Sequence, residues 1–352
     1  MSSDPRISVV IPAHNAVSTL QQSLDSVFAN RGVTYEVLLV NDASTDATEE
    51  LTLKFPARVV SLAKNIMSAN CRNLGAQLAR GEIVVFFDAD QLMEPDTLAR
   101  YAAALDANPG VTAVVGSLAA DTPMPGFFSR FKNFQHHYTH QTADREGATL
   151  ASGLVAIRRD AFLKLGGFEP AFSGASIEDI ALGYRMVREG HRIRFEPSIQ
   201  IVHLKGYTFR QMVRSDILHR AIPWTGLMLR EKMYRSDLNT RSGNVASVVF
   251  AWLIPLFAMA GLLGLNIAWI GAGAAAATIA FLNAPFLGAA RREFGLWFAL
   301  RSAAFLPVMY FYHGVGLLAG IATYLRGGSV AKRRAPPEPI YQLREGQQVR
   351  SA

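Results

Sequence analysis

The stretch Ile83-Val-Val-Phe-Phe-Asp-Ala-Asp90 carries the pattern from which the fold follows. Five consecutive apolar residues, all β-branched or aromatic, predict a strand that is buried on both faces, as in a parallel sheet. Asp88 and Asp90 follow directly, so the predicted strand ends in two carboxylates. In α/β proteins, ligands bind at the edge formed by the carboxyl ends of the strands. We therefore expect Asp88 and Asp90 at a ligand-binding edge.

Two upstream segments repeat this pattern of an apolar run followed by polar residues. The run 7–11 precedes Pro12-Ala-His-Asn15, and the run 36–40 precedes Asn41 and Asp42. Further predicted elements are a strand at 59–62 and helices at 48–55 and 69–79. This alternation predicts an α/β domain with helices on both faces of a parallel sheet. Asn15 and Asp42 are then expected at the same edge as the Asp88/Asp90 pair.

Asp88 and Asp90 are candidate metal ligands. Carboxylates two residues apart at a strand end can face the same way, and their oxygens suit Mg²⁺ or Mn²⁺ that bridges to substrate phosphates. A solvated acidic turn is the alternative for an isolated Asp-x-Asp. The sequence contains neither a Gly-x-x-x-x-Gly-Lys-Ser/Thr loop nor a glycine-rich dinucleotide fingerprint after a strand. A nucleotide here is therefore expected to be held by a metal and side chains.

The C-terminal part of the chain is far more apolar. Residues 242–290 contain no Asp, Glu, Lys or Arg. This run is too long for one membrane span of about 20 residues and fits a hairpin of two, expected near 245–264 and 268–289. A third uncharged run, 302–325, crosses the membrane, is re-entrant or lies in the interface. Buried helices of a soluble core are the alternative, but such helices seldom stay uncharged all round over this length.

The charges beside these runs predict the orientation. Segment 204–241 has eight Lys or Arg and three acids, and Arg291 and Arg292 follow the hairpin. The positive-inside rule places both clusters in the cytosol, together with an N-terminal domain that has no secretory signal. Segment 326–352 has six Lys or Arg and two acids, and would lie outside, against the rule, if 302–325 crossed. Its last part, 336–352, is predicted to be a disordered tail.

The amino-acid composition limits the classes of partner that are expected for this chain. The 352 residues are 50% hydrophobic and 18% charged, with a net charge of +7, which excludes disordered, collagenous and coiled-coil proteins. The single cysteine, Cys71, excludes an internal disulfide framework. The basic excess lies beside the apolar runs and in the tail, where anionic lipid explains it better than nucleic acid. Membrane lipids, and no nucleic acid, are the expected partners.

Short motifs follow one another in a fixed order through residues 6–210. They are Ile7-Ser-Val-Val-Ile-Pro-Ala-His-Asn15, Val40-Asn-Asp-Ala-Ser-Thr-Asp46, Asn70-Cys-Arg-Asn-Leu-Gly75, Phe87-Asp-Ala-Asp90, Ala151-Ser-Gly153, Leu165-Gly-Gly-Phe168, Ile177-Glu-Asp-Ile180 and Val202-His203. Each motif is weak alone, but the ordered series resembles that of the family 2 glycosyltransferases of GT-A fold. The resemblance implies a Rossmann-like mixed sheet followed by C-terminal transmembrane helices. The expected domains are 1–215 (GT-A domain), 216–244 (basic juxtamembrane segment), 245–325 (two or three hydrophobic helices) and 326–352 (basic, Pro-containing tail).

The resemblance also implies a nucleotide-diphospho-sugar as donor. On this basis Asp42 would hydrogen-bond the base, and Asn65 and Arg72 would hold the donor from beneath. The implied donor-binding residues near the start of the chain are Pro12, Ala13, Asn15, Asp42, Asn65 and Arg72. Asp88 would contact the ribose or the metal.

The remaining implied roles concern the metal and the chemistry. Asp90 would bind Mg²⁺ or Mn²⁺ beside the diphosphate, and His203 would complete metal or diphosphate binding. Asp179 matches the catalytic base, which would take the proton of the acceptor hydroxyl during direct displacement with inversion. Glu178 beside it is a second catalytic candidate, because paired acids raise the chance that one has an elevated pKa. The pair is also explained by a helix N-terminus, which favours acids in its first turn, and both explanations can hold together.

Two further groups have competing explanations. Arg220 and Trp224 loosely resemble the Gln-x-x-Arg-Trp motif of processive membrane synthases, although the Gln is missing and the two residues are not adjacent. Arg220 is a candidate for the donor diphosphate, and Trp224 equally for an interfacial anchor. The histidines between 136 and 140 are better explained by an amphipathic helix over 127–141 than by a zinc site. Gly316-x-x-x-Gly320 weakly favours close helix packing.

The sequence thus predicts a membrane-anchored inverting glycosyltransferase acting on a hydroxyl of a lipid-linked or membrane-proximal glycan or lipid. A polyprenyl-phosphate glycosyltransferase is the alternative within this class, and its anionic acceptor would not need Asp179. A membrane scaffold or transport subunit with an inactive sugar-nucleotide-binding domain is the alternative from another class. The intact series of acidic residues argues against the last alternative.

Overall fold

The computed structural model describes residues 4–169, 177–232, 242–327 and 340–346. The chain forms two compact units, each made of separate segments. Unit 1 consists of Met1–Met124, Ala143–Lys205 and Ala331–Ala352, and unit 2 of Pro125–Thr142 and Gly206–Val330. The units are not continuous in the sequence: 125–142 groups with 206–330, and 331–352 groups with the N-terminal part of the chain.

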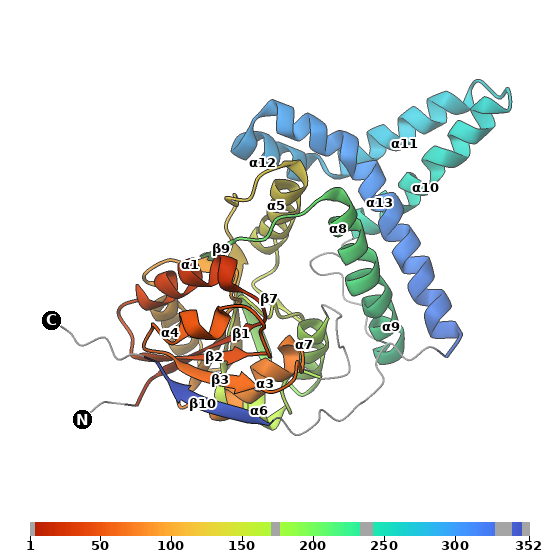
Figure 1. The fold of residues 1–352 in the computed structure, drawn as a ribbon. Helices are drawn as coiled ribbons and strands as arrows, with labels where there is room; N and C mark the ends of the chain where they lie inside the picture. Colours follow the sequence, from red (N-terminus) through yellow and green to blue (C-terminus); the bar gives the residue numbers. More distant parts are fainter. Residues whose placement is uncertain (1–3, 170–176, 233–241, 328–339, 347–352) are drawn as a thin grey trace. The chain divides into compact units, whose positions relative to one another are not determined.

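Unit 1 is an α/β domain (Figure 1). Its strands are β1 (Ile7–Ala13), β2 (Tyr35–Asn41), β3 (Arg58–Leu62), β4 (Ile83–Phe86), β5 (Gln91–Met93), β6 (Val111–Leu118), β7 (Glu146–Gly147), β8 (Val155–Arg158), β9 (Arg192–His203) and β10 (Tyr341–Glu345). Its helices are α1 (Val17–Phe28), α2 (Thr48–Thr52), α3 (Ser68–Leu78), α4 (Thr97–Asp106), α6 (Arg159–Lys164) and α7 (Glu178–Arg188). Each strand and helix expected before residue 90 is present, with ends shifted by at most a few residues.

The strands form one mixed sheet in the order β10-β3-β2-β1-β4-β8-β6-β9-β5, with β7 paired to β9. The neighbours β3, β2, β1 and β4 are parallel, as expected from their continuous apolar runs. Beyond them, β8 is antiparallel to both β4 and β6, and β9 is parallel to β6. The predicted mixed GT-A-type sheet is confirmed, and the carboxyl ends of β1, β2 and β4 share one edge.

The core explains why these segments fold as they do. Leu20, Leu24 and Val27 recur at helical spacing on α1 and are fully buried against the strands. α3 lies so close to β1 that a Cβ at Gly75 would meet Val10 Cγ1 at 2.3 Å. Side-chain volume at residue 75 would therefore push away the helix that carries Arg72.

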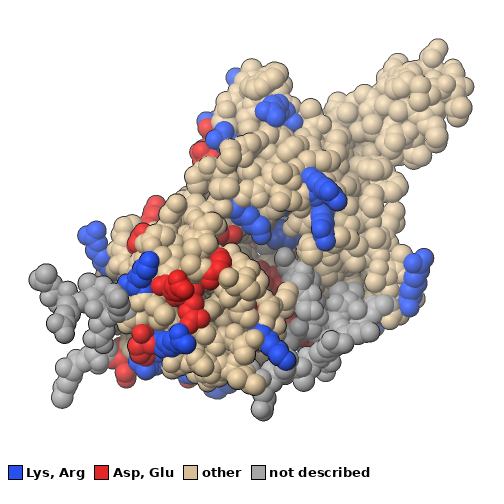
Figure 2. All heavy atoms as spheres, viewed as in Figure 1, with Lys and Arg blue, Asp and Glu red and all other residues tan. Residues whose placement is uncertain are grey.

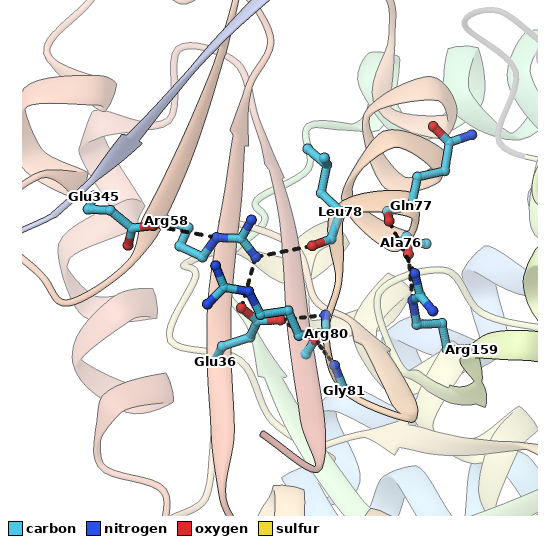
Figure 3. A network of polar contacts seen from close by, with 10 residues as sticks. Glu36, Arg58, Ala76, Gln77, Leu78, Arg80, Gly81, Arg159 and Glu345 are labelled. Atoms are coloured by element: carbon cyan, nitrogen blue, oxygen red, sulfur yellow. Dashed lines mark hydrogen bonds and ion pairs between the residues drawn. The ribbon is translucent and has the colours of Figure 1, made fainter. Parts of the chain in front are cut away.

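β10 corrects the expectation of a disordered tail over 336–352, because residues 341–345 form a strand antiparallel to β3. Figure 3 shows the polar contacts behind this edge, in which Arg58 lies between Glu36 and Glu345. Arg58 Nη1 is 2.9 Å from Glu36 Oε2 and donates to the Leu78 carbonyl at 3.1 Å, while its Nε is 3.7 Å from Glu345 Oε1. The edge strand of the unit 1 sheet beside β3 therefore comes from a segment that follows the apolar C-terminal helices in the chain.

Unit 2 is helical in the part that the structure describes. Its elements are α5 (Phe127–Gln141), α8 (Phe209–Arg214), the π-helix η1 (Ser215–Ala221), α9 (Ile222–Glu231), α10 (Ser242–Leu262), α11 (Ala268–Leu282), α12 (Ala284–Phe294) and α13 (Leu296–Leu325). The amphipathic helix expected at 127–141 is confirmed as α5, and its phenylalanines pack on aromatic rings of α12 and α13. The visible face of the α10–α11 hairpin carries no charged side chain (Figure 2).

α10 and α13 are each long and apolar enough to cross a membrane, and α11 with α12 forms a third candidate that bends by 67°. The second expected span, 268–289, is thus broken at Asn283, which precedes Pro285. Asn283 Nδ2 donates to Ser247 Oγ at 3.1 Å, and Tyr310 Oη donates to Asn283 Oδ1 at 2.7 Å. The break therefore joins α10, the α11–α12 pair and α13 through buried hydrogen bonds.

Candidate active site

The loops after β1 and β2 hold each other through Asn15. Asn15 has a left-handed backbone with φ of 51°, and its side-chain oxygen accepts the Thr45 backbone N–H at 2.8 Å. Its own backbone N–H donates to Ser44 Oγ at 3.0 Å. Asn tolerates this conformation better than most residues. The Pro12-Ala-His-Asn15 turn is therefore fixed at the carboxyl edge of the sheet.

Asp42 organises the loop that leads into α3. Its buried carboxylate accepts the backbone N–H of Ile66 at 2.6 Å and of Met67 at 3.0 Å. Asn65 lies in the same loop, with its Nδ2 3.4 Å from the Asp42 carbonyl. The structure thus brings Asp42 and Asn65 together, but the Asp42 carboxylate already accepts two hydrogen bonds from the protein.

Arg72 joins two segments that are far apart in the sequence. Its Nη2 donates to Asp88 Oδ1 at 2.5 Å, and its Nη1 lies 3.3 Å from Glu178 Oε1. Burial opposes the positive charge, but Asp88 and Glu178 outweigh this effect and raise the pKa of Arg72. The guanidinium also lies over the Phe168 ring, 5.9 Å from its centroid. Arg72 therefore ties the end of β4 to the start of α7.

Asp90 faces the end of β9. Its Oδ2 is 3.4 Å from His203 Nε2, and both side chains are partly exposed. Burial favours a higher pKa for Asp90, but hydrogen bonding to His203 and the nearby charges of His203 and Lys205 leave the pKa below its ordinary value. Asp90 therefore stays ionised near neutral pH, beside an imidazole and open to solvent.

Glu178 and Asp179 begin α7 and differ in their surroundings. Glu178 is buried, and burial together with the charge of Asp179 raises its pKa from 4.5 to about 7. Its Oε2 is buried without a hydrogen-bond partner in the described part of the chain. Asp179 accepts the Ser152 backbone N–H at 3.1 Å through Oδ2 and the Ile180 N–H at 2.8 Å through Oδ1. Backbone donors thus orient the Asp179 carboxylate.

Two hydrogen bonds to predicted site residues, made by Gln91 and Ser152, were not predicted from the sequence. Gln91 Oε1 accepts the Asp88 backbone N–H at 3.0 Å, and Ser152 supplies the N–H for Asp179. The motif Ala151-Ser-Gly153 was a signal for the second contact, although no role was assigned to it. Gly153 lies against Asp88, since a Cβ there would meet Asp88 Oδ2 at 2.5 Å. Ser152 and Gly153 therefore connect Asp179 with Asp88.

Arg220 is the one predicted site residue that belongs to unit 2. It lies on η1, and its Nη1 is 3.1 Å from His136 Nε2 on α5. The other predicted residues all belong to unit 1. The sequence expectation of a donor contact for Arg220 stays a prediction.

Asp90 and His203 in unit 1 suit a divalent ion whose remaining ligands come from a phosphate-bearing substrate and water. No group of three or more His, Cys, Asp or Glu side chains in the described ranges is arranged as a complete metal site. Asp90 and His203 nevertheless present an oxygen and a nitrogen 3.4 Å apart and accessible to solvent. Mg²⁺ and similar ions commonly take only one or two protein carboxylates and complete their shell with phosphate and water. The donor set therefore fits such an ion.

Known proteins of two families resemble parts of this chain. The profile of the family described as Glycosyl transferase family 2 matches residues 8–166, and that described as N-terminal domain of galactosyltransferase matches 132–207. An uncharacterized glycosyltransferase of Haemophilus influenzae is 23% identical over 60% of this chain and 71% of its own length. The putative glycosyltransferase EpsE of Bacillus subtilis is 26% identical over 54% of this chain and 70% of its own length.

Two more similarities differ in extent. The succinoglycan biosynthesis protein ExoO of Rhizobium meliloti is 35% identical over 29% of this chain, and the match spans 30% of ExoO. The solved structure of the mannosyltransferase PcManGT from Pyrobaculum calidifontis, in complex with GDP-Man and Mn²⁺, aligns with a TM-score of 0.56 at 21% identity. This alignment covers 92% of the present chain and 88% of PcManGT. At this identity the likeness shows a shared fold.

Proposed function

We propose a reaction for this chain, which belongs to the family 2 glycosyltransferases: it transfers a sugar, with inversion, from a nucleotide-diphospho-sugar to a hydroxyl of a lipid-linked or membrane-proximal acceptor. The observation that carries the proposal is the convergence of acidic residues. Arg72 joins Asp88 to Glu178, while Ser152 and Gly153 join Asp179 to Asp88. A donor-side carboxylate and a candidate base therefore belong to one cluster in unit 1.

The donor would bind at the carboxyl edge of β1, β2 and β4. The turn at Pro12, Ala13 and Asn15 and the loop held by Asp42 and Asn65 would border the nucleoside. Support comes from the fold shared with PcManGT, whose solved complex contains GDP-Man.

Asp90 and His203 would hold a divalent cation, with Asp88 beside them toward the ribose or the same ion. Such an ion, when bound, would neutralise the negative charge that develops on the diphosphate leaving group. The partly exposed, ionised state of Asp90 suits this role. Mn²⁺ in the PcManGT complex makes Mn²⁺ the first ion to test, with Mg²⁺ second.

Asp179 would act as the general base. The acceptor oxygen forms a bond to the sugar C1 while the bond from C1 to the diphosphate oxygen breaks, and the hydroxyl proton passes to the Asp179 carboxylate. Backbone donors from Ser152 and Ile180 hold this carboxylate in place. Glu178 would then keep Arg72 in position. A single displacement of this kind inverts the configuration at C1.

Membrane attachment follows from two helices that are long and apolar enough to cross a bilayer. The parity of the number of membrane crossings is inferred from the course of the chain. Both ends of the membrane region connect to unit 1, because β10 follows α13 and pairs with β3. A folded domain lies on one side of a membrane, so the number of complete crossings between Lys205 and Ala331 is even.

We assign the crossings to the hairpin of α10 with the α11–α12 pair, and α13 to the membrane interface. The C-terminal half of α13 packs on helices that precede the hairpin: a Cβ at Gly316 would meet Ala221 Cβ at 2.6 Å, and one at Gly320 would meet Thr225 Cβ at 2.6 Å. The close packing expected of Gly316-x-x-x-Gly320 is confirmed. With the positive-inside rule, unit 1 would then be cytosolic.

The test is sugar transfer by the purified full-length protein. UDP-, GDP- and other sugar nucleotides are screened for Mn²⁺- or Mg²⁺-dependent release of nucleoside diphosphate, with hydroxyl acceptors and a polyprenyl phosphate compared. Asp90→Ala and Asp179→Asn should each abolish transfer to hydroxyl acceptors while the melting temperature stays within a few degrees of the unaltered protein. Asp160→Asn, an exposed acid on α6, is the control.

Three results would count against parts of the proposal. Full activity of Asp179→Asn removes the base assignment. Transfer to the polyprenyl phosphate alone, unaffected by Asp179→Asn, favours the anionic acceptor. No binding of any sugar nucleotide with metal, measured by calorimetry, favours the inactive scaffold.

A further inference from the structure

Unit 2 contains a cavity of about 480 Å³ that the sugar-transfer site does not use. Its walls come from α5, η1, α9, α10, α12 and α13, all within unit 2. Most of its lining is apolar, including Phe131, Val245, Val248, Phe286, Leu306 and Leu317. Two of the helices concerned, α10 and α13, are each long and apolar enough to cross a membrane. An apolar chain is therefore the natural occupant of most of this space.

One side of the cavity is ionic. Lys132 Nζ lies 2.7 Å from Asp216 Oδ1, and Asp216 Oδ2 accepts from Tyr312 Oη at 3.0 Å and lies 3.6 Å from His313 Nε2. Lys132, Asp216 and His313 all line the cavity. The Asp216 carboxylate is therefore fully engaged, and its charge is balanced by Lys132.

Arg220 lines the same side of the cavity with a different partner. Its Nη1 is 3.1 Å from His136 Nε2, and in the described part of the chain no carboxylate lies within ion-pair distance of its guanidinium. Burial, with the charges of Lys132 and Arg220, puts the pKa of His136 well below its ordinary value. His136 is therefore neutral and accepts the hydrogen bond. The cavity wall keeps one positive charge that no described acid balances.

We infer that this cavity binds a lipid phosphate, with the phosphate against Arg220 and the hydrocarbon chain along the apolar wall. Guanidinium groups recognise phosphate through paired hydrogen bonds, and one anionic headgroup would balance the charge left by Arg220. A free nucleotide or sugar would leave the apolar wall unused, whereas an amphiphile covers both parts. Arg220 and Asp216 also lie on a π-helix, a distortion often found at functional sites.

This inference reassigns Arg220 from the donor diphosphate to a lipid phosphate, and it does not depend on the proposed sugar transfer. Lipid binding is measured without donor, so its failure and the failure of the transfer reaction are separate results. If the reaction is confirmed, the cavity becomes the place where an anionic lipid or lipid-linked acceptor is held.

Native mass spectrometry of the full-length protein in detergent tests the inference with four probes. These are a polyprenyl phosphate, the corresponding neutral polyprenol, phosphatidylglycerol and inorganic phosphate. We expect the polyprenyl phosphate to bind, and Arg220→Gln to weaken binding by about tenfold or more, as for the loss of a charged hydrogen bond. Arg220→Lys should retain part of the affinity. Arg210→Gln, an exposed arginine on α8 outside the cavity, should leave it unchanged.

A second variant addresses the apolar wall in case Arg220→Gln impairs folding. Leu306→Trp fills the cavity and should weaken lipid binding while inorganic phosphate stays a poor ligand. Tighter binding of the polyprenyl phosphate than of phosphatidylglycerol identifies an isoprenoid carrier, and equal binding identifies a membrane phospholipid; both uphold a lipid phosphate. Equal binding of the neutral polyprenol, equal binding of inorganic phosphate, or no effect of Arg220→Gln and Leu306→Trp would overturn it.

Discussion

Arg72 shows how one side chain can set the geometry of a whole site. Its guanidinium is buried and contacts both Asp88 and Glu178, which lie 90 positions apart in the sequence. A planar fork can hold two carboxylates at once, whereas the ammonium of lysine is a single point charge. Removing the guanidinium would leave two acids facing each other without a counter-charge.

We predict that Arg72→Lys lowers kcat/KM by about tenfold to a hundredfold. The reason is the loss of one charge-assisted hydrogen bond, worth about 1.5–3 kcal/mol. Arg72→Ala should also destabilise unit 1 by about 3–5 kcal/mol, as when one partner of a buried ion pair is removed. Steady-state kinetics and thermal unfolding measure the two effects. The control is Arg100→Lys, which keeps a more exposed contact with Glu94; an unchanged kcat/KM in Arg72→Lys would contradict the bridging role.

The raised pKa of Glu178 leads us to predict that the stability of the folded protein depends on pH. Its pKa is raised in the folded protein from 4.5 to about 7, so the folded state binds more protons than the unfolded state between these values. The stabilising contribution is therefore fully present below about pH 4.5 and is lost as the pH rises through about 7. In Glu178→Gln, the melting temperature should fall less between pH 5 and pH 8 than in the unaltered protein. Parallel curves for the two proteins would exclude this role, and Asp160→Asn serves as the control.

At the level of elements, glycines let loops approach the strand ends. Gly153 brings the segment before β8 against Asp88 and Gln91, where a Cβ would lie 2.5 Å from Asp88 Oδ2 and 2.7 Å from Gln91 Nε2. Gly167, with φ of 69°, lies against Asn73, which accepts the Phe168 N–H at 2.8 Å. The glycine motifs thus position the loops around Arg72 and Asp88.

Gly153→Ala is predicted to impair donor binding more than folding. The added methyl group must displace the Asp88 carboxylate, and so disturb its contact with Arg72. We expect the KM for the sugar nucleotide to rise by about tenfold, with a melting temperature lowered by a few degrees. Gly110→Ala is a matched control, because its Cβ would meet only the flexible end of Arg192 at 3.3 Å. Equal KM values in the two variants would refute the steric argument.

The secondary structure of unit 1 followed closely from local patterns. Strands such as β1 and β4 were predictable from β-branched runs, and α7 from acids before a helical apolar spacing. The break at Asn283 was missed because residues 242–290 look uniformly apolar. It depends on hydrogen bonds from Tyr310 and to Ser247, which lie on other helices.

At the scale of the whole molecule, β10 allows a test of the membrane topology, because it follows the helices of unit 2 in the chain and yet pairs with β3 in unit 1. We predict that a cysteine in the α10–α11 loop, Leu265→Cys, reacts with a membrane-impermeant maleimide added to intact cells. Gln342→Cys, on β10, should react only after the membrane is permeabilised, because unit 1 is placed in the cytosol. The native Cys71 is buried and serves as the internal background. Labelling of Gln342→Cys in intact cells would contradict the cytosolic placement of unit 1.

Local patterns along the chain were sufficient for the class of the fold, the membrane helices as a group, and the residues that end β1, β2 and β4. These features depend on hydrophobic periodicity and on neighbours within a few residues. Local patterns could not predict contacts between distant segments. These contacts are those of Arg72 with Asp88 and Glu178, of Ser152 with Asp179, of β10 with β3, and of Arg220 with His136 in the cavity of unit 2. Those pairings are set by the packing of the folded chain, because they depend on which surfaces are buried together.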